Sequence, residues 1–95
     1  MAAPALSWWH MTQDLGQRDG MKRARAVLAT TAEGEISGDE DTLRLITSEF
    51  TAVINCISRG DRKIFTTIIV AGHEGSLTSG LMKEIRTGMR GGLLE

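Results

Sequence analysis

Few residues in this sequence have a type and a spacing that suit catalysis. The only candidate imidazole bases are His10 and His73, which lie far apart along the chain. The pair His73-Glu74 lacks a second histidine at helical spacing, and one cysteine with two histidines gives no structural zinc pattern. We therefore expect no catalytic residues, no metal site and no cofactor.

Cys56 is the single cysteine, and it lies between Asn55 and Ile57 in an apolar stretch. A free cysteine in such a position is more often a small buried hydrophobic residue than a nucleophile. It cannot form an internal disulfide, and the start Met-Ala-Ala-Pro-Ala lacks the basic and apolar regions of a secretory signal. These features predict a cytoplasmic protein.

The segment from residue 72 to 76 is the one place where the sequence suggests an anion site. A loop between a predicted strand and a predicted helix presents backbone amides to a phosphate or carboxylate. The residues that would bind the anion are Gly72, His73, Gly75 and Ser76. An enzyme acting there on a phosphorylated or acyl substrate is the third of three functional hypotheses, because the loop lacks a P-loop or dinucleotide fingerprint.

Basic residues near the C-terminus support the second hypothesis, a small regulator that binds nucleic acid. Lys83, Arg86 and Arg90 have helical spacing, so their side chains can line a phosphate backbone, and Arg62 and Lys63 extend the patch. The net charge of −1 provides no overall positive field, which makes a solvated helix face the simpler interpretation.

The leading hypothesis is a non-enzymatic protein–protein interaction module, namely an adaptor, inhibitor or assembly component that self-associates. Trp8 and Trp9 are adjacent, so both cannot face the same surface well, and tryptophan is enriched in interfaces. Leu93 and Leu94 follow a flexible Gly-Gly pair and are further contact candidates. The expected partner is a second copy or another protein, with nucleic acid as the alternative and no membrane contact.

The clearest periodicity predicts a long amphipathic helix from Asp39 to Ser58. Ser37 and Glu40 can form a capping box before this helix, and Gly60 can close its last turn. The apolar residues that recur at spacings of three and four are Leu43, Ile46, Phe50, Val53, Ile54 and Ile57.

The segment Ile64 to Val70 predicts a central strand, because it is rich in β-branched residues and is apolar on both faces. Such a strand needs hydrogen-bond partners. We favour Ala26 to Thr31 as the partner within the chain, and the alternative is the same strand of a second copy. Residues Met21 to Thr31 fit either a helix or a hairpin.

Two shorter helices complete the predicted fold. Ser7 to Leu15 fits an N-terminal helix, and Ser76 can cap a final helix with Leu77, Leu81 and Ile85 on its inner face. We expect an α+β fold, with a small single-layer sheet packed by the long central helix; the alternative is a mostly α fold with one strand that pairs across a dimer.

Length and composition set the domain organisation. The chain has 95 residues, of which 41% are hydrophobic and 24% are charged, as in an ordinary globular protein. We expect one domain over residues 1–95, with an N-terminal arm at 1–6 and a C-terminal tail at 91–95. The longest apolar run is much shorter than the roughly 20 residues that span a bilayer.

Overall fold

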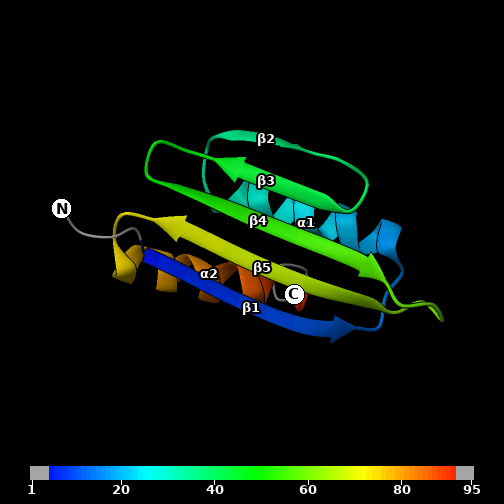
Figure 1. Cartoon of the computed structure of the whole chain (residues 1–95). Coiled ribbons are helices and arrows are strands. Elements are labelled where there is room, and N and C mark those ends of the chain that lie inside the picture. Colours follow the sequence, from blue (N-terminus) through cyan, green and yellow to red (C-terminus); the bar gives the residue numbers. More distant parts are fainter. Residues whose placement is uncertain (1–4, 92–95) are drawn as a thin grey trace.

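A five-stranded antiparallel sheet carries two helices on one of its faces (Figure 1). The computed structural model describes residues 5–91. The elements in chain order are β1 (Ala5–Gln13), α1 (Gln17–Thr31), β2 (Glu35–Gly38), β3 (Thr42–Ile46), β4 (Phe50–Ser58), β5 (Ile64–Gly72) and α2 (Gly75–Met89). The strand order across the sheet is β1-β5-β4-β3-β2.

Strands β2 to β5 form a meander of three hairpins, and β1 lies beside β5 after the chain has passed through α1. The pairing of β1 with β5 extends without a break from Ala5 opposite Gly72 to Gln13 opposite Ile64. The strand β5 is therefore an interior strand between β1 and β4, while β1 and β2 are the two edges.

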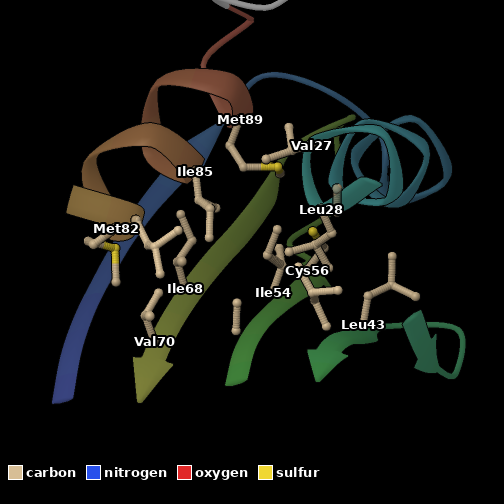
Figure 2. Close-up of a cluster of buried hydrophobic side chains, with 14 of the residues drawn as sticks. Val27, Leu28, Leu43, Ile54, Cys56, Ile68, Val70, Met82, Ile85 and Met89 are labelled. Atoms are coloured by element: carbon tan, nitrogen blue, oxygen red, sulfur yellow. The ribbon is translucent and has the colours of Figure 1, made fainter. Parts of the chain in front are cut away.

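The core lies between the sheet and the helix layer. Helix α2 packs over β1 and β5, α1 packs over β3 and β4, and the two helices contact each other. Side chains from both layers meet in one cluster (Figure 2). Its largest fully buried members are Leu28, Leu45, Ile54, Ile64, Ile68, Ile85 and Met89.

The predicted helix from Asp39 to Ser58 is wrong, because this segment forms β3 and β4. In β4, Ala52, Ile54 and Cys56 face the core, while Val53 and Ile57 point to the other face. The apolar residues of the predicted helical stripe are therefore divided between the two faces of the strands, whose side chains alternate with a period of two. The segment is rich in β-branched residues, which favour strands.

Turns replace the predicted helix signals. The Asp39 carboxylate accepts hydrogen bonds from the backbone amides of Asp41 and Thr42, at 3.2 and 3.1 Å, in the turn between β2 and β3. These bonds hold the pKa of Asp39 below its ordinary value. The negative charge thus stabilises a hairpin here, and this contribution is lost as the pH falls through the lowered pKa.

The predicted N-terminal helix from Ser7 to Leu15 is also wrong, since most of it belongs to β1. Residues Ala26 to Thr31 lie in α1, so they are not the partner of the central strand. The mostly α alternative fails as well, because β5 lies between β1 and β4 of its own chain and needs no second copy.

Two predicted elements are confirmed. The strand predicted from Ile64 to Val70 is β5, an interior strand of the sheet, although the middle position belongs to β4. Helix α2 places Leu81 and Ile85 in the core and packs Leu77 against it. Among the described residues, both helices nevertheless cover the same face of the sheet, and Ile69 on the other face of β5 retains 36% exposure.

The turn between β4 and β5 has an unusual backbone. Lys63 donates its amide hydrogen to the carbonyl of Gly60 at 2.9 Å, and the two central residues, Asp61 and Arg62, have φ values of 49° and 59°. Two positive φ values define a type I′ turn, which follows the twist of a hairpin. Glycine, rather than arginine, is favoured at the second central position.

The substitution Arg62→Gly will therefore stabilise the protein by about 1 kcal/mol, because the left-handed conformation costs a residue with a Cβ about that much. The matched control is Arg59→Gly. Arg59 lacks a positive φ, so the control will lower stability by about 0.5 to 1 kcal/mol. Urea denaturation followed by circular dichroism measures both, and a destabilised Arg62→Gly variant would contradict the assigned turn.

Neither helix found in residues 5–91 has the length and apolar character needed to cross a membrane.

Candidate interaction surface

The face of the sheet without helices carries most of the exposed large apolar side chains. The described residues include six such side chains, and five of them point to this face. They retain between 36 and 65% of their accessible surface and are Leu6, Trp8, Ile46, Ile57 and Ile69. We call this side of the sheet the open face.

The strand register arranges the open face in rows. Trp8, Ile69 and Val53 are direct neighbours across β1, β5 and β4. The next row towards the β4–β5 turn contains His10, whose ring stacks on Trp8 at a centroid distance of 5.4 Å. His10 also lies 5.4 Å from Phe65 in a tilted arrangement. Aromatic and aliphatic surface is therefore continuous across three strands.

Charge is sparse on this face. Among its strand residues in the described part of the chain, Arg44 is the one Lys or Arg, and Glu35 is the one Asp or Glu. Strands spaced about 4.8 Å apart, with nine residues rising about 3.3 Å each, give a face of about 600 Å². This area is close to one side of a standard protein interface, and its composition resembles the apolar centre of one.

The two tryptophans lie on opposite sides of β1. Trp8 is on the open face, whereas Trp9 points towards the helix layer, where the Arg86 guanidinium lies 4.4 Å from the centre of its ring. Of the two tryptophans predicted to lie in an interface, Trp8 is part of the open face and Trp9 is not. Leu93 and Leu94 lie outside the described residues, as do residues 1–4 of the predicted arm, while Ala5 and Leu6 belong to β1.

The five basic residues that the sequence predicts to bind nucleic acid lie away from the strand residues of the open face. Lys83, Arg86 and Arg90 are on or just after α2, and Arg62 and Lys63 are at the β4–β5 turn. The structure brings some of them towards Asp14, which forms an ion pair with Lys63 at 3.8 Å and lines a shallow hollow with Arg90. The negative charge of Asp14 lies beside these cations and would repel a phosphate there. Nucleic-acid binding stays a prediction.

The loop from Gly72 to Ser76 joins β5 to α2, as the sequence predicts. Its residues His73, Gly75 and Ser76 are exposed. The carboxylates of Glu49 and Glu74 line the same hollow as His73, and their negative charge opposes an anion there. The anion site and the enzyme hypothesis built on it stay predictions, and residues 5–91 contain no cluster of three or more His, Cys, Asp or Glu residues suited to a metal ion.

Cys56 lies in β4 and faces the core, where it is fully buried. Burial raises the pKa of its thiol above the ordinary value, because the charged thiolate loses its hydration. The thiolate is the reactive form of cysteine, so the side chain is unsuited to nucleophilic chemistry in the folded protein.

Iodoacetamide will consequently label Cys56 at pH 8 only as fast as the protein opens, and urea above the unfolding midpoint will restore the rate of a free thiol. Because the thiol pKa is raised on folding, stability will fall as the pH rises above the ordinary thiol range. Mass spectrometry of the alkylated protein measures the rate. Labelling of the native protein at the free-thiol rate would contradict the buried position.

Most of the open face is not evident from the sequence. The helical period places Ile46 and Ile57 on a buried stripe, and the apolar run of β5 predicts that Ile69 is covered. The signal that could have found them is the density of β-branched residues from Thr42 to Ile57, which favours strands with two distinct faces.

No family model matches the sequence, and no curated protein or solved structure shows significant similarity to it.

Proposed function

We propose that the protein is a non-enzymatic protein–protein interaction module that binds an apolar surface of another protein through its open face. The observation that carries the proposal is the gathering of five exposed large apolar side chains on the one face that the helices leave uncovered. Apolar surface of this extent on a small domain marks a contact site.

The chemistry of the face favours a protein partner over a phosphate-rich one. Arg44 alone provides fixed positive charge among its strand residues, whereas nucleic-acid sites need several cations along the backbone path. Trp8 provides a large, rigid contact at 60% exposure, flanked by Leu6 and Ile69. Buried tryptophan surrounded by aliphatic residues is typical of the centre of a protein interface.

A rigid scaffold supports this face. The side chains beneath it, such as Ile54 and Ile68, are fully buried against the two helices (Figure 2). The open face is thus preorganised, which lowers the entropic cost of binding. A preformed apolar surface is sufficient for the role of an adaptor or assembly component, which requires binding and no catalysis.

The test is a double substitution, Ile57→Lys with Ile69→Lys, which places two charges on the open face. Both side chains are already partly exposed, so the fold will persist, and retention of a partner from host extract will fall at least about tenfold. The matched control, Ala26→Lys with Ala29→Lys, adds the same charge to exposed positions of α1.

The two double variants separate the outcomes. Loss of a defined partner with the face variant, and retention with the α1 variant, is the expected result. Equal retention by both, or equal loss from both, would show that the open face is not the binding surface. Circular dichroism of each variant confirms that the comparison is between folded proteins.

A further inference from the structure

Within residues 5–91, the outer side of β1 has none of the features that protect the edge of a sheet. Natural edge strands are blunted by charge, proline, bulges or short length. The strand β1 spans Ala5–Gln13 in unbroken register with β5, and it contains no Lys, Arg, Asp, Glu or Pro. Figure 1 shows it along one side of the sheet, with α2 behind it.

The opposite edge is protected. The strand β2 has four residues, begins with Glu35 and ends at Gly38, which has a positive φ. Such an edge offers little template for pairing. The contrast between the two edges makes β1 the place where the sheet can be extended.

No backbone of a loop or helix within residues 5–91 hydrogen-bonds to β1, whose described backbone partners lie in β5. Alternate amides and carbonyls of a long edge strand therefore face outwards. The helix layer also holds β1 firmly, because the buried Gln13 side chain donates to the carbonyl of Met89 at 2.6 Å. A firmly held, unblocked edge is suited to pairing with another strand.

We propose that β1 pairs antiparallel with β1 of a second copy, so that two five-stranded sheets join into one ten-stranded sheet. A two-fold axis with full overlap of the nine residues places Trp9 opposite Trp9 of the other copy. In this register Trp8 of one copy lies opposite His10 of the other, on the open face.

Chemistry within the strand favours a second copy as the occupant. A strand without charged side chains meets its own copy without like-charge repulsion. Trp8 and His10 already stack within one chain, and the proposed register adds the same aromatic pairing across the axis. Because directly opposite residues share a face, the two open faces form one continuous surface.

The test exploits Leu6 and Thr12, which are exposed and lie opposite each other in this register. The double variant Leu6→Lys with Thr12→Lys places lysine opposite lysine at both ends of the pairing, and Leu6→Glu with Thr12→Glu does the same with glutamate. The dissociation constant of each homodimer will rise at least about tenfold, because like charges directly opposite destabilise strand pairs. A mixture of the two will restore a dimer.

Light scattering after size exclusion measures the mass, which will be twice the 10.3 kDa of the chain for the unsubstituted protein and for the mixture. The matched control, Thr51→Lys with Ile57→Lys, puts two lysines on the open face away from β1 and will leave the dimer intact. A monomeric unsubstituted protein would overturn the proposal, even if a strand of another protein binds β1. So would a dimer that resists the β1 charges.

Failure of this proposal is distinguishable from failure of the proposed function. If the dimer persists in the β1 charge variants but dissociates in the control variant, the dimer interface lies on the open face and not at the β1 edge. In the opposite case, the β1 charge variants behave as expected while the Ile57→Lys, Ile69→Lys variant keeps every partner. That combination would support pairing through β1 and contradict the proposed function.

Discussion

Replacing Ile54 with alanine will lower the free energy of unfolding by about 2 to 5 kcal/mol, whereas Val53→Ala will cost less than about 1 kcal/mol. Ile54 is fully buried between β4 and the helices, and its removal leaves a cavity. Val53 is the next residue and points to the open face. A helix from Asp39 to Ser58 would place both on one buried stripe and predict comparable losses.

Urea denaturation of the two variants provides the measurement. A loss of this size is a large share of the stability of a small domain and can unfold it. The milder variant Ile54→Val is therefore measured as well, and it will lower the free energy of unfolding by about 0.5 to 1.5 kcal/mol. Similar losses at positions 53 and 54 would contradict the assignment of β4.

Gln13→Leu will destabilise the protein by about 1 to 3 kcal/mol, because it leaves the buried Thr66 hydroxyl without its acceptor and removes one of the two donors to the Met89 carbonyl. The Gln13 side chain accepts a hydrogen bond from the Thr66 hydroxyl at 2.7 Å and donates to the Met89 carbonyl at 2.6 Å. Arg23 donates to the same carbonyl at 2.9 Å. This network joins β1 and β5 to the last turn of α2.

A second substitution tests the cause of the loss. Adding Thr66→Val to Gln13→Leu replaces both buried partners by apolar groups, and the pair will be less destabilised than the sum of the single changes. The exposed neighbour Thr12→Ala serves as the control and will change stability by less than about 0.5 kcal/mol. Additive losses would show that Gln13 and Thr66 do not act as a unit.

The fold is predictable from sequence where one signal dominates. The segment from Ile64 to Val70 is too rich in β-branched residues to be helical, and Leu77, Leu81 and Ile85 have a spacing that suits only a helix face. Between Leu43 and Ile57, by contrast, apolar residues on both faces of two strands imitate a helical stripe. Local patterns cannot separate these cases when a sheet has apolar residues on its solvent side.

The candidate surface was less predictable than the fold. Trp8 was identified from its residue type, but Ile46, Ile57 and Ile69 become neighbours of the same surface only through the pairing of β3, β4 and β5. Register is a long-range property that a single sequence does not display. The sequence does contain the signal of the exposed β1 edge, since none of the 13 residues that precede Asp14 is Lys, Arg, Asp or Glu, but the same segment also fits a short helix.

The most direct test of the open face as a binding surface is photo-cross-linking with benzoylphenylalanine placed singly at Trp8, Val53 or Thr67, and at Ala26, Ala29 or Lys83 as controls. The first three positions lie on the open face, and the others are exposed on the helix layer. If the open face binds the partner, every open-face position will give one discrete cross-linked protein and the helix positions will give none. Cross-links from the helix positions alone would contradict binding through this face.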